Sequence, residues 1–403
     1  MSDKDLFKPY DFEACEVCGT CLSTCPVMEL PLTEAKREME AMRSGEQGRH
    51  VLSRCESCFA CNLACPNGAN PAQLFLARFG EHYDKHSLPP YGLFFQPYQE
   101  HNFRQVALDG MPEDERQMVE SWKDESPVEE FLYPGCNLTA TAYLTRTSLL
   151  AGLPIRGGMD YCCGETLYRT GLHDHLRQNA ARLDAWIRRL GARRMHVLCN
   201  AGTVMFTRVL PRFGFTSDVE IVPMLPRIHK RLMQGEIPVV KKLGMKLTIQ
   251  ESCYAKVLGP DYADIPREIC EAIGVEVVEM EHCRERSFCC GIGGGFPAKS
   301  GYNPFRIIGA SARVLSEARR TGADGILAYC SGCLIMLSTM RMVVPTFLPV
   351  YHLLELIAEA AGEPVERRIT RRALTHLLGT MRYQFPKLLS GGRVRMKEIE
   401  PLP

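Results

Sequence analysis

The run Cys15-Glu-Val-Cys18-Gly-Thr-Cys21-Leu-Ser-Thr-Cys25-Pro26 decides the first part of the fold, and its spacing recurs in Cys55-Glu-Ser-Cys58-Phe-Ala-Cys61-Asn-Leu-Ala-Cys65-Pro66. Eight thiolates at this spacing predict two [4Fe-4S] cubanes, whose chemistry is one-electron transfer. Structural zinc held by CxxC pairs is the alternative. Zinc takes four ligands per ion and gains nothing from a third cysteine and a Cys-Pro ending in both runs, so the pattern favours iron.

The same run is typical of bacterial two-cluster ferredoxins, in which the fourth cysteine of one run serves the other run's cluster. This resemblance implies that one cubane is held by Cys15, Cys18, Cys21 and Cys65, and the other by Cys55, Cys58, Cys61 and Cys25. Residues 33–43 are rich in strong helix formers and end near Gly45, which predicts a helix between the two runs. We therefore expect a helical two-cluster ferredoxin domain at residues 1–90, followed by a connector at 91–127.

Composition narrows the function classes. Lys+Arg of 48 against Asp+Glu of 47 gives a net charge of +1, which predicts neither nucleic-acid binding nor a polybasic membrane patch. The first residues contain acidic side chains and no apolar leader segment, so we expect a cytoplasmic protein whose 19 cysteines are metal ligands more than disulfides. If the iron-sulfur clusters are exposed to solvent, we expect the host organism to be anaerobic. The longest uncharged stretch, residues 325–340, is too short to span a bilayer, so any membrane association would need a partner subunit.

From about Pro127 the order of predicted elements repeats. The first copy has a strand at 131–133 before Cys136, a helix at about 140–150, Cys162-Cys163-Gly164, an amphipathic helix at about 172–190, and a strand at 195–198 before Cys199. The second has a strand at 247–250 before Cys253, a helix at 265–273, a strand at 275–280, Cys289-Cys290-Gly291, a helix from Asn303 to Arg319, and a strand at 326–329 before Cys330. Alternating strands and helices predict parallel α/β units, with cysteines just past the carboxyl ends of strands.

These patterns predict an α+β multidomain fold. After the helical two-[4Fe-4S] module and the connector we expect two pseudo-equivalent α/β lobes, at 128–240 and 241–356, and a C-terminal tail at 357–403. The lobes are expected to face each other across a cleft that holds their cysteines.

The second lobe offers five thiol ligands: Cys253, Cys289, Cys290, Cys330 and Cys333. Adjacent cysteines can bind different irons of one cluster, and the glycine after them leaves room for backbone beside inorganic sulfide. The pattern resembles the CCG (cysteine-rich) domain family of heterodisulfide reductases, and a ferredoxin module followed by two CCG repeats is similar to the fused D-type polypeptide of those enzymes. The resemblance implies a catalytic noncubane [4Fe-4S] cluster at these five cysteines, with Gly291, Gly293 and Gly294 giving backbone clearance.

The first lobe departs from the family pattern. It keeps Cys136, Cys162, Cys163 and Cys199, but Gly202 stands where the last cysteine is expected. Four thiols could hold a further cluster or a zinc ion, or no metal at all. Because symmetric disulfide cleavage by the family uses two facing clusters, a degenerate first site would favour electron relay to a partner.

Three functions agree with these residues. The chain is a disulfide-reducing subunit acting on a small-molecule disulfide or thiol, an iron-sulfur subunit of a quinone-linked flavoprotein dehydrogenase of the glycolate, lactate or glycerol-3-phosphate type, or a relay inside a larger bifurcating or reductase complex. The sequence has no flavin motif, so we expect redox partners such as a flavoprotein or a membrane cytochrome or quinone-linked subunit.

Overall fold

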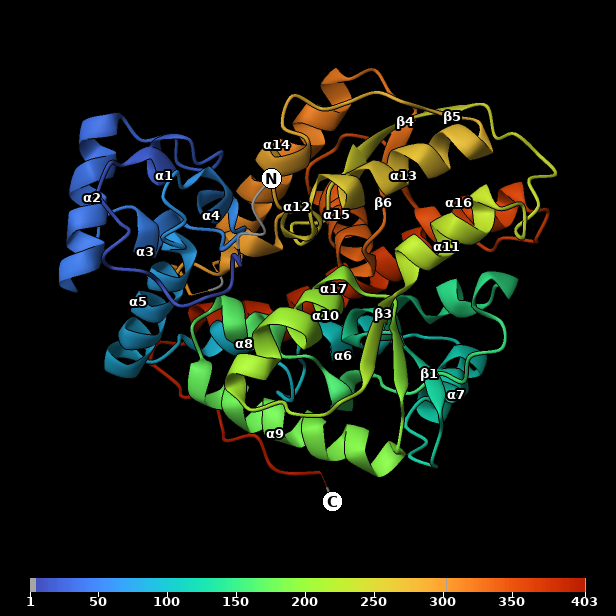
Figure 1. Cartoon of the computed structure of the whole chain (residues 1–403), viewed down its shortest axis with the longest axis horizontal. Helices are drawn as coiled ribbons and strands as arrows, with labels where there is room; N and C mark the ends of the chain where they lie inside the picture. Colours follow the sequence, from blue (N-terminus) through green and yellow to red (C-terminus); the bar gives the residue numbers. More distant parts are fainter. Residues whose placement is uncertain (1–4, 302, 403) are drawn as a thin grey trace.

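The computed structural model describes residues 5–301 and 303–402. They form an α+β protein in which a helical N-terminal unit lies beside two small parallel sheets (Figure 1). The unit contains α1 (Thr20–Ser23), α2 (Leu32–Ser44), α3 (Val51–Arg54), α4 (Ala60–Ala64) and α5 (Pro71–His86). The predicted helix between the runs is confirmed as α2, which ends where Gly45 turns left-handed with φ of 83°. Its buried face, which includes Met39 and Met42, packs against α5.

A connector follows α5 and contains a 3-10 helix (Pro90–Phe95), α6 (Phe103–Leu108) and α7 (Glu113–Ser121). The Asn102 side chain accepts hydrogen bonds from the backbone N–H of Arg104 and Gln105, which fixes the start of α6.

The first sheet has three parallel strands in the order β1-β2-β3. Its elements are β1 (Glu130–Tyr133), α8 (Glu165–Arg169), α9 (His173–Leu190), β2 (Arg194–Val197), α10 (Asn200–Val204), β3 (Glu220–Pro223) and α11 (Met224–Met233). The predicted amphipathic helix is α9, which buries Trp186 against Phe131 of β1, with ring centroids 5.7 Å apart. It ends at Gly191, where φ is 62°.

The helix expected at about 140–150 is wrong as an α-helix. Two 3-10 helices, Cys136–Thr145 and Ser148–Leu150, occupy the segment, and Thr141 has the non-helical φ of −131°. The hydroxyls of Thr139 and Thr145 donate to carbonyls three residues back. Such local bonds compete with an α-helical hydrogen-bond ladder, which explains the difference.

The second sheet has four parallel strands in the order β5-β4-β6-β7. Its elements are β4 (Met245–Gln250), α12 (Ala255–Leu258), α13 (Pro260–Ile273), β5 (Val275–Val277), α14 (Pro304–Arg320), β6 (Gly325–Ala328), α15 (Ser331–Val343), β7 (Val350–His352) and α16 (Leu353–Ala360). As predicted, Asn303 caps α14 by accepting from the N–H of Phe305. In α13 Pro260 starts the helix earlier than expected, and β5 is shorter.

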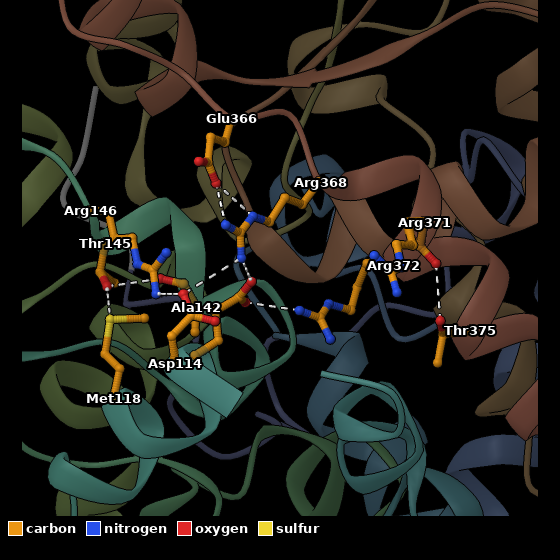
Figure 2. A network of polar contacts seen from close by, with 11 residues as sticks. Asp114, Met118, Ala142, Thr145, Arg146, Glu366, Arg368, Arg371, Arg372 and Thr375 are labelled. Carbon is orange, nitrogen blue, oxygen red and sulfur yellow. Dashed lines mark hydrogen bonds and ion pairs between the residues drawn. The ribbon is translucent and has the colours of Figure 1, made fainter. Parts of the chain in front are cut away.

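The segment expected as a tail contains α17 (Ile369–Leu389), which packs on α6 and α15. Arg368 and Arg372 at its start both donate to the carboxylate of the fully buried Glu115 on α7, and Figure 2 shows the surrounding polar network. The chain then returns to the N-terminal unit, where Val394 pairs with Leu88. Among residues 5–301 and 303–402, no helix combines the length and the apolar character that crossing a bilayer requires.

Candidate iron-sulfur centres

The eight cysteines of the N-terminal runs are buried or half-buried. Burial, followed by the neighbouring thiol of Cys65 and those of Cys15 and Cys18, raises the pKa of Cys21 to about 12. Burial and the thiol of Cys58 raise the pKa of Cys25 to about 12. The structure therefore brings Cys65 to the first run and Cys25 to the second. Thiols in such surroundings ionise when a metal ion compensates their charge.

The backbone of both runs is left-handed at the same two positions, on either side of the second cysteine. The φ angles are 54° at Val17 and 80° at Gly19, against 51° at Ser57 and 65° at Phe59. A left-handed valine is costly and persists only where its surroundings hold it. Backbone N–H groups also approach sulfur, with Ser57 donating to Cys55 at 3.4 Å. Loops with this backbone conformation, whose N–H groups point at cysteine sulfurs, fit cubane clusters.

In the second sheet, the five cysteines predicted as catalytic ligands lie together at the carboxyl ends of β4 and β6 and before α14. Thiol–thiol hydrogen bonds connect them in the order Cys253, Cys289, Cys290, Cys333 and Cys330. Bonds from Cys253 and Cys290 lower the pKa of Cys289. The Cys333 thiol, helped by the first N–H groups of α15, lowers the pKa of Cys330 against the effect of burial. This donor set fits one polynuclear cluster.

Of the three glycines predicted to lie beside this site, Gly293 contacts it most directly. The N–H of Gly293 donates to the sulfur of Cys289 at 3.3 Å, and a Cβ at Gly293 would lie 2.7 Å from the carbonyl of Glu56 and 3.1 Å from that sulfur. A Cβ at Gly291 would instead strike Ser311 of α14, and one at Gly294 the carbonyl of Arg306. Gly291 and Gly294 therefore allow the loop to pack on α14, while Gly293 allows close approach of the Glu56 carbonyl and the Cys289 sulfur.

In the first sheet, four cysteines also gather. The sulfurs of Cys136 and Cys162 are 3.1 Å apart, and the thiols of Cys162 and Cys163 are hydrogen-bonded. Burial and then the thiol of Cys330 raise the pKa of Cys199. The cysteine sites of the two sheets are therefore neighbours, with Cys199 and Cys330 close enough to interact electrostatically.

The residue in place of the fifth cysteine is Gly202. A Cβ there would lie 3.1 Å from Val197 and 3.3 Å from the ring of Tyr133. The Tyr133 hydroxyl donates to the carbonyl of Tyr161, which fixes the ring. An aromatic ring thus occupies the space beside position 202.

Two buried arginines that the sequence did not single out contact these sites. Arg104 is 3% exposed and donates from Nε to the sulfur of Cys136 at 2.9 Å. Arg169 is 1% exposed and donates to the sulfur of Cys253 at 3.4 Å and to Glu165 at 2.8 Å. Burial opposes the charge of Arg104, but the thiols of Cys136 and Cys162 outweigh it and raise the pKa of Arg104. Since a buried cation needs an anion, each arginine favours a thiolate, and so a metal centre, beside it.

The first of these arginines gives a test of the first site. We expect Arg104→Gln to lower any metal content of that site and to cost about 3 kcal/mol of unfolding free energy, because a buried thiolate would lack its counter-charge. Metal analysis and denaturant unfolding measure both. Arg193→Gln is the control, since Arg193 is 85% exposed and pairs with the exposed Glu129. Equal metal content in the chain and its Arg104→Gln variant would contradict this role.

Comparisons with known proteins agree with these sites. Residues 8–66 match the 4Fe-4S dicluster domain and residues 247–338 the cysteine-rich domain. The chain is 25% identical to the D-type polypeptide of dihydromethanophenazine:CoB–CoM heterodisulfide reductase from Methanosarcina mazei, over 87% of this chain and 94% of that protein. It is 29% identical to the EtfAB:quinone oxidoreductase of Syntrophomonas wolfei, over 43% of this chain and 25% of that protein. It is 32% identical to the probable iron-sulfur-binding oxidoreductase FadF of Bacillus subtilis, over 39% and 22%. The matched domains contain all eight cysteines of the runs and the five of the second sheet.

Proposed function

Starting from the homology of this chain to the D-type polypeptide of heterodisulfide reductase, we propose that it is an iron-sulfur oxidoreductase subunit that passes single electrons between two cubanes and a cluster in its second cysteine-rich repeat. A disulfide or thiol is the substrate class at that last site. The electrons enter or leave through a redox partner subunit, of the flavoprotein or membrane-cytochrome and quinone-linked kinds.

The junction between the second run and the second site is the observation that carries this proposal. Arg169 donates to the carbonyl of Glu56 at 2.6 Å while it donates to the sulfur of Cys253. Ser57 donates to the carbonyl of Arg169 at 3.0 Å, and Arg313 of α14 forms an ion pair with the Glu56 carboxylate. Glu56 directly follows Cys55, a ligand of one cubane. The buried Arg169 therefore contacts both the neighbour of that ligand and Cys253, a ligand of the second site. A short path between the two centres follows.

We propose the following residues as ligands. The cubanes are held by the two crossed sets of four cysteines, and a noncubane cluster by the five cysteines of the second site. The four cysteines of the first site hold a further cluster or a zinc ion. When bound, the clusters supply or accept electrons singly, whereas reducing a disulfide takes two electrons and two protons.

The protein groups around the second site position and charge-balance its thiolates. Arg169 offsets the charge of Cys253, the N–H of Gly293 orients Cys289, and the amino end of α15 does the same for Cys330. Four of the five cysteines are at least nine-tenths buried, which limits access of water.

The domain arrangement is part of the proposal. A dicluster domain (1–90) and a connector (91–127) precede two related CCG lobes (128–240 and 241–356) and a C-terminal segment (357–403). Both sheets are parallel, and cysteines follow β1 and β2 in the first sheet and β4 and β6 in the second, which supports a duplication. The electrostatic interaction of Cys199 with Cys330 supports a site shared between the lobes.

Electron relay without a substrate of its own is the second candidate, and the Tyr133 ring beside Gly202 favours it. A first site that lacks its fifth thiol offers no symmetric partner for cleaving a disulfide. In that case the function is closer to that of the iron-sulfur subunit of a quinone-linked flavoprotein dehydrogenase.

Iron and acid-labile sulfide on anaerobically purified protein test the wiring. We expect about twelve irons per chain if the cubanes and the second site are filled, and about sixteen if the first site holds a cluster as well. A new electron paramagnetic resonance signal on adding a thiol or disulfide to the oxidised protein supports substrate binding. The lack of such a signal, with about twelve irons present, would leave relay as the function. About eight irons would overturn the cluster at the second site.

A further inference from the structure

A cavity of about 290 Å³ lies beneath α17, away from the cysteines themselves. Phe94, Phe95 and Phe103 line it from the connector, and Met336 and Met340 from α15. Aromatic rings and flexible methionines make a surface suited to a flat apolar molecule. Its volume is close to the lower end of the range for small-molecule sites.

Three polar side chains of α17 also line this cavity: His376, Thr380 and Gln384, each one helical turn from the next. His376 is 3% exposed and Gln384 8%. Within the described part of the chain, the Nε2 of His376, the hydroxyl of Thr380 and both amide atoms of Gln384 have no hydrogen-bond partner. A helix face that only fills a core carries apolar residues, and buried polar groups are nearly always paired. An occupant with hydrogen-bonding atoms would pair these groups.

The hydrogen bonds around His376 indicate which hydrogen-bonding groups that occupant carries. Thr339 uses its hydroxyl hydrogen on the carbonyl of Ile335 at 2.7 Å, so its oxygen accepts from Nδ1 of His376 at 3.3 Å. Burial lowers the pKa of His376 to about 4, although a hydrogen bond with the backbone of Phe103 acts in the opposite direction. The ring is therefore neutral near pH 7. Its Nε2 is then an acceptor for a hydroxyl, while the Gln384 amide can both donate and accept.

Two residues that line the cavity are close in sequence to groups of the cysteine sites. Met336 follows Cys333 by three residues on α15, a rise of about 5 Å along the helix. Phe103 directly precedes Arg104, whose guanidinium donates to Cys136.

We propose that this cavity binds an apolar molecule of the quinone class, a ring system that carries carbonyl or hydroxyl oxygens. The oxygens bond with His376, Thr380 and Gln384, and the ring lies among the phenylalanines and methionines. This site lies outside the clusters and the disulfide chemistry proposed above.

Calorimetric titration of the anaerobic full chain with 2-methyl-1,4-naphthoquinone and with naphthalene tests the site. We expect Gln384→Leu and His376→Phe to weaken naphthoquinone binding about ten-fold or more, with naphthalene binding within about two-fold of the unmodified chain. Gln384→Leu should also raise the melting temperature, because it removes an unpaired buried amide. Thr380→Val is a milder change that still tests the site if the other two variants fail to fold. Leu374→Ala, on the exposed side of α17, is the control.

Absence of naphthoquinone binding, or equal loss with the Leu374→Ala control, would overturn the inference. So would a lower melting temperature of Gln384→Leu, since the amide would then have a structural partner. Iron content is measured on the same samples, and a normal value separates failure of this site from failure of the proposed clusters.

Discussion

The Cys290→Ala variant, purified without oxygen, is expected to hold about four fewer irons per chain than the unmodified protein and to lose any response to thiols or disulfides. Cys290 stands in the middle of the five-cysteine set, hydrogen-bonded to Cys289 on one side and Cys333 on the other. Because binding of a structural metal group contributes to folding free energy, the second sheet should also unfold more readily. Iron analysis, paramagnetic resonance and thermal unfolding measure the three effects.

Cys270→Ala is the matched control for this variant. Cys270 is fully buried on α13 in the apolar core of the second sheet, apart from the five-cysteine set. The Cys270→Ala variant also loses a buried thiol, so we expect an unchanged iron content and a modest loss of stability. If both variants kept the same iron content, Cys290 would not be a ligand.

The Arg169→Gln variant is expected to lower the reduction potential of the second-site cluster and to cost about 3–5 kcal/mol of unfolding free energy. A positive charge beside a cluster stabilises the extra electron of its reduced state, and Arg169 is a buried cation beside Cys253. Potentiometric titration followed by paramagnetic resonance measures the first effect, and denaturant unfolding the second. Arg169→Lys keeps the charge but loses the forked geometry, so it should restore part of the potential and less of the stability.

Arg177→Gln serves as the control for Arg169, because Arg177 lies on α9 with a side chain that is 60% exposed. Its potential should equal that of the unmodified chain. A folded Arg169→Gln protein with an unchanged potential would show that the arginine supports packing alone.

The sequence predicted those elements whose ends carry local signals. Asn303 with Pro304 marks a helix start and Gly191 a helix end by their own chemistry, and in the structure α14 begins and α9 ends at these residues. The prediction for 140–150 was wrong because threonine hydroxyls within that segment bond to the backbone, an effect that helix propensity does not capture. Element order was therefore easier to predict than the kind of helix.

The cysteine sets were visible because metal ligands recur at fixed spacing, whereas their charge partners were not. Arg169 lies 84 residues before Cys253 and Arg104 lies 32 before Cys136, so no short pattern connects them. The polar stripe at His376, Thr380 and Gln384 likewise reads as a solvated face until the packing of α17 against α15 is known. Only tertiary structure distinguishes such a stripe from an ordinary surface.

The return of the chain to its N-terminal unit bears on the order of biosynthesis. The N–H of Met396 donates to the hydroxyl of Tyr83 on α5 across 313 residues of sequence, beside the pairing of Val394 with Leu88. Synthesis proceeds from the amino end, so the ribosome produces the ferredoxin unit long before Val394 and Met396, which add to the contacts that Arg169 and Arg313 make with Glu56. The unit can therefore fold before these contacts form.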